Sequence, residues 1–301
     1  ALVEGIPVIF HPDPTDVLTI AKAIAKHQAT VYCSTSTFLR LFSRNRHIHP
    51  LMLDSLRVVV SGAERLNAEV RDAFKLKFNT DIYEGYGTTE TTPVASVNLP
   101  DRIDQRNWKV QKGNKPGTVG MPLPGGSFRI VDPDTLVSLP VGEDGLILFG
   151  GSQVMLGYLN DPEKTADVIV DMDGKRWYKT GDKGHLDQDG FLTIVDRYSR
   201  FAKIGGEMIS LGAIESAIAK VLPENTEVLA TALPDGKKGE KVILLMAGEI
   251  NQDEMKELVE QSGLNPLMRP AKFIQVDSIP KLGSGKNDFN RAKQLAMEAS
   301  A

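Results

Sequence analysis

Apolar runs and helix-spaced segments alternate along the first hundred residues. Helical spacing begins at Thr15 and again at Asn67, whose side chain is a good helix cap. Strands that alternate with helices predict a βαβ lobe with a mostly parallel sheet. Four buried strands are predicted, at residues 6–10, 29–34, 56–64 and 81–87.

The pattern changes after about residue 100. Residues 101–117 are polar and irregular, and helical periodicity is nearly absent from there to Ser210. Short strand-like runs with Gly, Pro and Asp turns between them predict an antiparallel, barrel-like β region. These runs lie at residues 127–135, 145–151 and 190–197.

A third pattern begins near Ser199. An amphipathic helix over 211–222 stops at Pro223, and two strand-like runs follow. A further helix begins after Asn251, with Glu254 completing a capping box. The fold expected is therefore α/β and α+β. It has a βαβ lobe over residues 1–113, a small β-barrel-like lobe over 114–198, and a small C-terminal α+β domain over 199–301.

Composition narrows the class of protein. The 301 residues are 41% hydrophobic and 25% charged, as in an ordinary soluble globular chain. A net charge of −4 gives no reason to expect nucleic acid as a partner. The single cysteine, Cys33, excludes an internal disulfide framework, and the five histidines have no metal-ligand spacing. Without a long apolar run or a signal-peptide layout, the chain is expected to be cytoplasmic.

Two loops, at residues 61–64 and 84–90, follow predicted strands, where ligands bind in parallel sheets. The loop at Glu84–Glu90 offers backbone N–H groups and Thr hydroxyls to phosphate, a Glu to Mg²⁺ and a Tyr to a base. It is not a dinucleotide fingerprint, because the third glycine would fall on Glu90. Further along, Asp182 ends a "YKTGD" segment and could accept both hydroxyls of a ribose.

A Gly-Ser-Gly-Lys run near the end of the chain raises the question of a phosphate-binding P-loop. That motif needs a Gly where this chain has Pro280, and a Ser or Thr where it has Asn287. Both ends fail. From the residues alone, the run is a Gly-rich turn that carries Lys286.

The order of the motifs is more specific than any one of them. The motifs are "SGAE" (61–64), "YGTTE" (86–90), "GGSQVMLGYLNDPEKT" (150–165), "YKTGD" (178–182), "DRYSRFAKIGGEMISLGAIE" (196–215) and "IPKLGSGK" (279–286). Together they resemble the adenylate-forming superfamily of acyl-CoA synthetases, luciferases and peptide-synthetase adenylation domains. Residues 196–215 and 280–289, with 10–16 and 34–42, most resemble the acyl-carrier-protein synthetase half of the bifunctional 2-acylglycerophosphoethanolamine acyltransferase/acyl-ACP synthetase family.

The resemblance implies roles for individual residues. Lys286 would be the catalytic lysine of adenylation, on a mobile Gly-rich turn, and Thr89 would contact the α-phosphate. Glu90 would hold Mg²⁺, Asp182 would take the ribose hydroxyls, and Arg197 would lie against the ribose and phosphate. The nucleotide site would also include Gly62, Ala63, Glu64, Tyr86 and Gly87.

The remaining implied roles concern the acyl group and the thiol. Thr37 and Phe38 would line the acyl tunnel, with a core position as the alternative for Phe38. Ser199 would be the hinge of the rotating C-terminal domain, although the family usually has Asp or Lys there. The phosphopantetheine arm of the acceptor would pass the segment Gly205, Gly206 and Glu207.

The family's triphosphate loop does not appear in the chain. "GNKPGTVG", at residues 113–120, has neither its run of hydroxyl residues nor its position, and the sequence starts inside an apolar run. We therefore expect a C-terminal fragment of a larger enzyme. By resemblance, that parent would lie at the cytoplasmic face of the inner membrane and act in phospholipid reacylation.

The expected function is ATP- and Mg²⁺-dependent activation of a long-chain fatty acid to acyl-AMP, then transfer to the phosphopantetheine thiol of acyl-carrier protein. Coenzyme A as acceptor is the first alternative, and an inactive fragment that only binds AMP or a carrier protein is the second. His11 and Asp16 have the H-x₄-D spacing of glycerolipid acyltransferases, but two prolines between them favour a turn entering a helix. The sequence sets neither acyl chain length nor oligomeric state.

Overall fold

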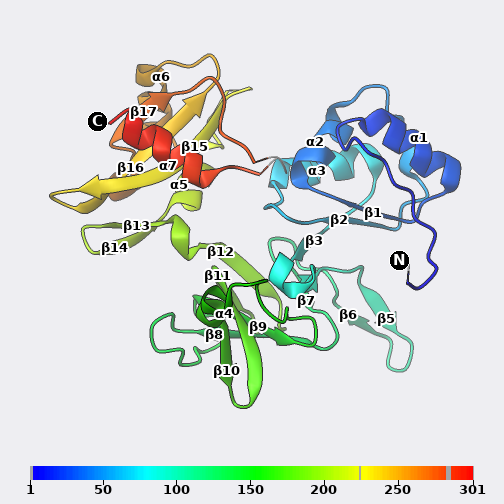
Figure 1. Cartoon of the computed structure of the whole chain (residues 1–301). Coiled ribbons are helices and arrows are strands. Elements are labelled where there is room, and N and C mark those ends of the chain that lie inside the picture. The colour runs from blue at the N-terminus through cyan, green and yellow to red at the C-terminus, as the bar shows by residue number, and fades with distance from the viewer. Residues whose placement is uncertain (1–2, 224, 283–285, 301) are drawn as a thin grey trace. The chain divides into compact units, whose positions relative to one another are not determined.

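The computed structural model describes residues 3–223, 225–282 and 286–300 (Figure 1). The chain divides into two compact units. Unit 1 comprises residues 1–180 and 184–194, and unit 2 comprises residues 181–183 and 195–301. Each combines helices and strands, which confirms the expected mixed fold class. Among the helices of the described ranges, none has both the length and the apolar composition needed to cross a bilayer.

The first part of unit 1 is built on a sheet with the order β1-β2-β3-β4-β7. Its first three strands are parallel and the last two are antiparallel additions. Leu39, Phe42 and Phe74 are fully buried in the core between the sheet and its helices. The elements are β1 (Val31–Ser34), β2 (Val58–Ser61), β3 (Ile82–Tyr86), β4 (Ser96–Val97), β7 (Met121–Pro122), α1 (Val17–His27), α2 (Ser36–Arg44), α3 (Ala68–Phe78), η1 (Pro50–Leu53) and η2 (Thr89–Thr91).

The expected strand over Ile6–Phe10 is wrong. These residues form no strand in the structure and all are exposed, with Phe10 at 77% and Ile6 at 57%. An apolar run favours burial, but a strand also needs a neighbouring strand to pair with. Residues 6–10 pair with no strand in the described part of the chain. The neighbouring helix and the three following strands are confirmed.

The second part of unit 1 is β-rich, and two stretches of its strands, residues 181–183 of β11 and 195–197 of β12, belong to unit 2. The main sheet has the order β10-β11-β9-β8, with β12 paired to β11, and β8–β9 and β10–β11 are antiparallel as expected. A separate hairpin lies in the segment that the sequence leaves irregular. The elements are β5 (Arg102–Asp104), β6 (Lys109–Gln111), β8 (Gly126–Val131), β9 (Gly145–Gly151), β10 (Ile169–Met172), β11 (Lys175–Leu186), β12 (Leu192–Arg197) and α4 (Pro162–Val168).

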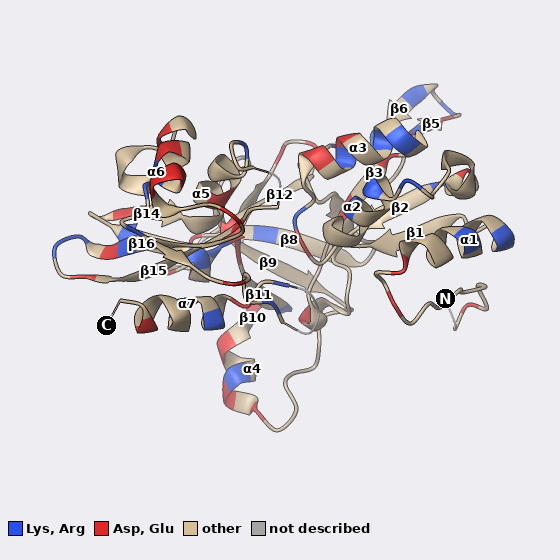
Figure 2. Ribbon diagram, turned by 90° about the horizontal axis from the view of Figure 1, so that it is seen from above, with Lys and Arg blue, Asp and Glu red and all other residues tan. Residues whose placement is uncertain are grey.

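Unit 2 is a sheet with helices on both faces. Alternate residues of β15 and β16 enter two separate cores, because successive side chains of a strand point to opposite faces. One core includes Ile214 of α5 and Met255 of α6, and the other includes Ala292 of α7. Acidic residues lie along α6 (Figure 2). The elements are η3 (Tyr198–Arg200), β13 (Phe201–Ile204), β14 (Glu207–Ser210), α5 (Leu211–Ile218), β15 (Glu227–Asp235), β16 (Gly239–Ala247), α6 (Gln252–Gln261), η4 (Pro266–Met268), β17 (Lys272–Gln275) and α7 (Phe289–Glu298).

Candidate active site

The loop after β2 is tied to the start of α2. Glu64 accepts two hydrogen bonds from Thr37, one from its backbone N–H at 2.5 Å and one from its hydroxyl at 3.1 Å. The N–H of Gly62 donates to the Ser34 carbonyl of β1 at 3.1 Å. Ala63 has a φ of +68°, a region that non-glycine residues rarely occupy. The contacts thus bring one residue expected at the adenine together with one expected at the acyl tunnel.

The loop after β3 turns sharply at Gly87. A Cβ atom added there would lie 1.8 Å from the Pro93 carbonyl oxygen, so only glycine fits this close approach. The loop then forms η2, in which Thr89 is exposed and Glu90 is half-buried. Tyr86, at the end of β3, has its ring centroid 6.4 Å from that of Phe128. The fold therefore holds the "YGTTE" segment in one defined conformation at the carboxyl end of a parallel strand.

Gly87→Ala is expected to destabilise unit 1 by about 2 kcal/mol, because the loop must move to admit the Cβ atom. Chemical denaturation measures the loss. Gly62→Ala is the matched control, since its added Cβ would meet its nearest neighbour, the Gly85 carbonyl oxygen, at an ordinary 3.6 Å. Equal loss in the two variants would contradict this account of the loop.

Glu90 is fixed by a tyrosine from a distant part of the chain. The Tyr158 hydroxyl donates to Glu90 Oε1 at 2.7 Å. Burial raises the pKa of Glu90, but its hydrogen bonds, chiefly the one from Tyr158, outweigh burial and bring that pKa below its usual range. Burial and the Glu90 carboxylate together raise the pKa of Tyr158 to about 12. Glu90 is therefore an ionised, oriented carboxylate near neutral pH, as a Mg²⁺ ligand must be.

Tyr158→Phe is expected to raise the pKa of Glu90, because the variant loses the hydroxyl that stabilises its ionised form. A ¹³C NMR titration of the Glu carboxyl carbons measures the shift. Glu84, which lies two residues before Tyr86 and accepts from the Gly117 N–H at 3.4 Å, is the internal control. A pKa of Glu90 that does not change in Tyr158→Phe would refute the assigned role of the tyrosine.

The expected ribose-binding carboxylate is deeply buried. Asp182 is 3% exposed and lies 3.2 Å from Nε of Arg197, whose side chain is 61% exposed. Both residues belong to unit 2. The structure therefore brings together the two residues expected at the ribose, with an arginine that extends toward solvent.

The expected hinge and thiol path lie on successive turns of unit 2. Ser199 is exposed on the short helix η3. Gly205 and Gly206 form the two-residue turn between β13 and β14, and both have positive φ, +62° and +91°. That turn type requires positive φ at both positions, so the pair of glycines follows from the turn itself. Glu207 pairs with Ile204 to close the hairpin and is exposed.

Lys286 is exposed in unit 2, and its carbonyl accepts the Leu282 N–H at 2.7 Å. A bridge between Lys281 and Asn287 brackets the same turn. The Gly-Ser-Gly part of the run, residues 283–285, lies outside the described residues. Phe38, expected at the acyl tunnel or in the core, is half-buried on the first turn of α2.

His11 and Asp16 lie in the turn that leads into α1, as the prolines predicted. Asp16 is the helix cap and accepts the Thr19 N–H at 3.1 Å. His11 Nε2 is 3.8 Å from the second Asp16 oxygen, and its Nδ1 contacts the backbone of Asp13. Because the Asp16 carboxylate caps α1, the H-x₄-D spacing of His11 and Asp16 is explained by the turn and does not indicate acyltransferase activity.

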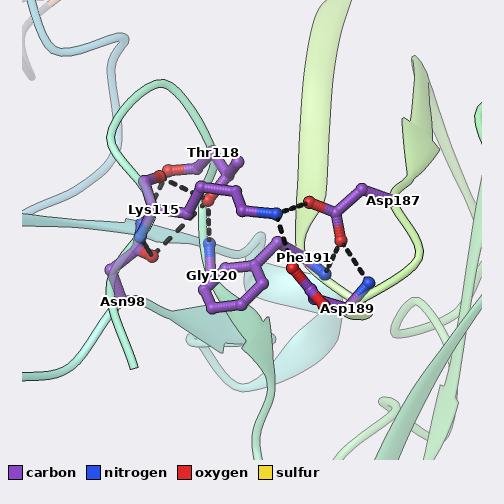
Figure 3. Close-up of polar contacts among 7 residues, drawn as sticks. All are labelled: Asn98, Lys115, Thr118, Gly120, Asp187, Asp189 and Phe191. Carbon is purple, nitrogen blue, oxygen red and sulfur yellow. Dashed lines mark hydrogen bonds and ion pairs between the residues drawn. The ribbon is translucent and has the colours of Figure 1, made fainter. Parts of the chain in front are cut away.

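The segment "GNKPGTVG" is held by a lysine rather than shaped as a phosphate loop (Figure 3). Lys115 forms ion pairs with Asp187 and Asp189 of the turn between β11 and β12, and its ammonium group lies 5.1 Å from the centroid of the Phe191 ring. The hydrogen bond to Asp187, followed by that to Asp189, raises the pKa of Lys115. Asn98 fixes the backbone of the same segment by accepting the Lys115 N–H at 3.0 Å. The segment thus joins two parts of unit 1.

Within residues 3–223, 225–282 and 286–300, no group of three or more His, Cys, Asp or Glu side chains is placed to hold a metal. This donor set still fits Mg²⁺, which proteins commonly bind through one or two carboxylates together with substrate phosphates. The ionised Glu90 meets that requirement. The role of Tyr158 in this site is not predicted by the sequence, although the tyrosine lies within the motif at residues 150–165.

Comparison with known proteins identifies relatives of the chain. The profile of the AMP-binding enzyme family matches residues 1–159. The chain is 31% identical to 4-coumarate–CoA ligase 1 of Glycine max, over 90% of this chain and 91% of that protein. It is also 31% identical to 4-coumarate–CoA ligase 2 of Solanum tuberosum, over 90% of this chain but 49% of that protein.

Solved structures give the same result. ATP-bound MatB from Rhodopseudomonas palustris matches with a TM-score of 0.81 and 27% identity, over 97% of this chain and 55% of that one. O-succinylbenzoate coenzyme A synthetase from Bacillus subtilis, in complex with AMP, matches with a TM-score of 0.76 and 26% identity, over 97% and 56%. The fold is that of an adenylate-forming enzyme. The chain belongs to the AMP-binding enzyme family, and it spans about half the length of several of these relatives.

Proposed function

We propose that this chain is part of a ligase that uses ATP and Mg²⁺ to convert a long-chain fatty acid to acyl-AMP with release of pyrophosphate, and then transfers the acyl group to the phosphopantetheine thiol of acyl-carrier protein. The observation that carries the adenylation step is the "YGTTE" loop, in which Tyr158 holds Glu90 ionised and Gly87 fixes the backbone. The narrower choice of acid and acceptor rests on the resemblance of residues 196–215 and 280–289 to acyl-carrier-protein synthetases.

In this proposal, each residue acts by position and charge. Glu90 would hold Mg²⁺, which neutralises phosphate charge when bound. Asp182 would accept the ribose hydroxyls, with Arg197 against the phosphate, and Thr89 would donate its exposed hydroxyl to the α-phosphate. Lys286 would place a positive charge where negative charge gathers, between the fatty carboxylate and the α-phosphate.

The second step needs little more than positioning. Attack of a thiol on the mixed anhydride releases AMP and is downhill, so the protein mainly aligns the two partners. Ser199 would act as the hinge, and the acceptor arm would pass the Gly205–Gly206 turn, where an added Cβ would meet no atom within 4 Å. The whole enzyme would act in phospholipid reacylation at the cytoplasmic face of the inner membrane.

Coenzyme A is the alternative acceptor, and a specific observation favours it. Three of the four relatives described above are coenzyme A ligases or synthetases by name. In that case the same adenylation chemistry would end in an acyl-CoA rather than an acyl-carrier protein. The two acceptors share the phosphopantetheine arm and differ in what carries it.

Preformed palmitoyl-adenylate supplied to the purified chain tests the proposal, because transfer of the acyl group from it does not require the loop that binds the triphosphate of ATP. Holo acyl-carrier protein and coenzyme A are compared as acceptors, each against a reaction without protein. Thioester on the carrier above the uncatalysed rate supports the proposal, and thioester on coenzyme A alone supports the alternative. Transfer to neither acceptor would refute the second step for this chain and would leave it as a module that only binds AMP or a carrier.

A further inference from the structure

Two turns of unit 2, at residues 205–206 and 236–238, lie side by side. The N–H of Gly205, in the β13–β14 turn, donates to the carbonyl of Lys238, in the β15–β16 turn, at 2.9 Å. The register places Ile204, the last residue of β13, opposite Gly239, the first residue of β16, so the end of β13 lies next to the second turn. Figure 2 shows basic residues at the turn between β15 and β16. The expected path of the acceptor arm is therefore bordered by a lysine-bearing hairpin.

The lysines at this place are available to a partner. Lys203, Lys237 and Lys238 are exposed, and no ion pair engages their ammonium groups within the described part of the chain. Two of the neighbouring acidic side chains, Asp235 and Glu240, accept hydrogen bonds from the backbone. Asp235 accepts the N–H groups of Lys237 and Lys238, each at 3.0 Å, and Glu240 accepts the Lys203 N–H at 2.6 Å. The carboxylates thus shape the two turns, while the ammonium groups stay uncommitted.

An exposed apolar side chain accompanies the lysines. Met208 is 52% exposed on β14, the edge strand of the sheet, and it pairs across the strands with Lys203. Side chains paired in this way lie close together on one face. A flexible methionine beside uncommitted positive charges is a combination suited to an acidic, partly apolar protein surface.

We infer that Lys203, Met208, Lys237 and Lys238 form a docking surface for the acidic face of the carrier protein that presents the acceptor thiol. The inference rests on the proposed thiol-transfer function. It commits to a protein partner rather than to the phosphates of coenzyme A, because the lysines are spread over strand β13 and the β15–β16 turn, an exposed methionine is paired with one of them, and the group includes no arginine. Docking here would deliver the phosphopantetheine arm beside the Gly205–Gly206 turn.

Fluorescence anisotropy tests the inference. Binding of labelled holo acyl-carrier protein to the chain is compared with that to Lys237→Glu/Lys238→Glu, at low and high salt. We expect the double variant to bind the carrier about tenfold more weakly at low salt, with a smaller difference at high salt. Lys22→Glu/Lys26→Glu, on exposed positions of α1 in unit 1, carries the same change in charge and is expected to bind normally.

Coenzyme A binding and acyl transfer complete the test. The double variant should bind coenzyme A as the unaltered chain does, and equal weakening toward both acceptors would overturn the inference. Free pantetheine, which has neither carrier nor nucleotide, reports on the transfer site. Normal carrier binding by the double variant, with active transfer, would refute the docking surface and leave the proposed function standing. If the unaltered chain transfers the acyl group to none of the three thiols, the proposed function is refuted. The comparison of carrier binding between the unaltered chain and the double variant would then still test the docking surface.

Discussion

Arg200→Met is expected to destabilise unit 2 by about 3 kcal/mol, because it leaves the Glu215 carboxylate buried without its partner. Arg200 Nη2 lies 2.7 Å from Glu215 Oε1, and the two side chains are 12% and 19% exposed. Glu215 also accepts the Ala230 N–H at 2.7 Å, which holds its carboxylate in place. Urea unfolding measures the loss.

Two further variants separate charge from packing. Arg200→Lys keeps the charge but loses the planar contact with the Phe289 ring, where the guanidinium carbon lies 4.2 Å from the centroid, so an intermediate loss is expected. Arg200→Met combined with Glu215→Gln removes both charges and should recover part of the stability. A double variant as unstable as Arg200→Met alone would show that packing, not the unpaired charge, sets the loss.

The loss in Arg200→Met should also depend on pH. Burial raises the pKa of Glu215, and Arg200 opposes that rise. Removing Arg200 therefore moves the folded-state pKa of Glu215 further above its unfolded value. A carboxyl group with a raised folded pKa lowers stability as pH rises, so the deficit should be larger at about pH 8 than at about pH 5. A deficit that does not change over this range would contradict the role given to Glu215.

This ion pair matters for function because of its place in the chain. Arg200 follows the expected hinge residue, Ser199, and its guanidinium lies over Phe289 at the start of α7. Phe289 is three residues after Lys286. Asp196 accepts hydrogen bonds from the Ser210 hydroxyl and the Gly212 N–H, at 2.6 and 2.9 Å. Arg200, directly after the expected hinge residue, is thus in contact with the first residue of α7, the helix that follows the turn containing Lys286.

Local patterns predicted local structure well. The caps Asn67 and Asn251, and the capping-box residue Glu254, act as their spacing indicates, since such hydrogen bonds span only two or three residues. The sequence does not predict the hairpin of β5 and β6, because its strands are polar and lack an alternating apolar face. Asp104 stabilises its turn by accepting the Arg106 N–H at 2.9 Å, a signal too common to predict a strand.

The site could be predicted in its parts but not in its pairings. Ordered motifs indicated the loops that carry Glu64 and Glu90. Their partners, Thr37 and Tyr158, lie 27 and 68 residues away, and only the fold brings them into contact. No period or spacing in the sequence encodes such a contact, because it depends on which strand lies beside which.

Lys286→Ala is expected to slow acyl-adenylate formation by about a hundredfold and to leave transfer from preformed palmitoyl-adenylate unchanged. In the proposed mechanism, the ammonium group stabilises charge that develops only as the carboxylate attacks the α-phosphate. Once the mixed anhydride exists, that charge has no part in the attack of the thiol. The lysine should therefore separate the two steps, which few other residues of the site would do.

ATP–pyrophosphate exchange measures acyl-adenylate formation, and the full-length ligase is used for it. Thioester formation from preformed palmitoyl-adenylate measures the transfer step. Lys281→Ala is the matched control, because Lys281 lies at the other side of the same turn and pairs with Glu227 at 3.0 Å. It should leave exchange close to normal. Equal slowing of both steps in Lys286→Ala would mean that the lysine shapes the turn rather than stabilising the transition state. Equal slowing of exchange in the two lysine variants would assign the effect to the structure of the turn that contains both lysines.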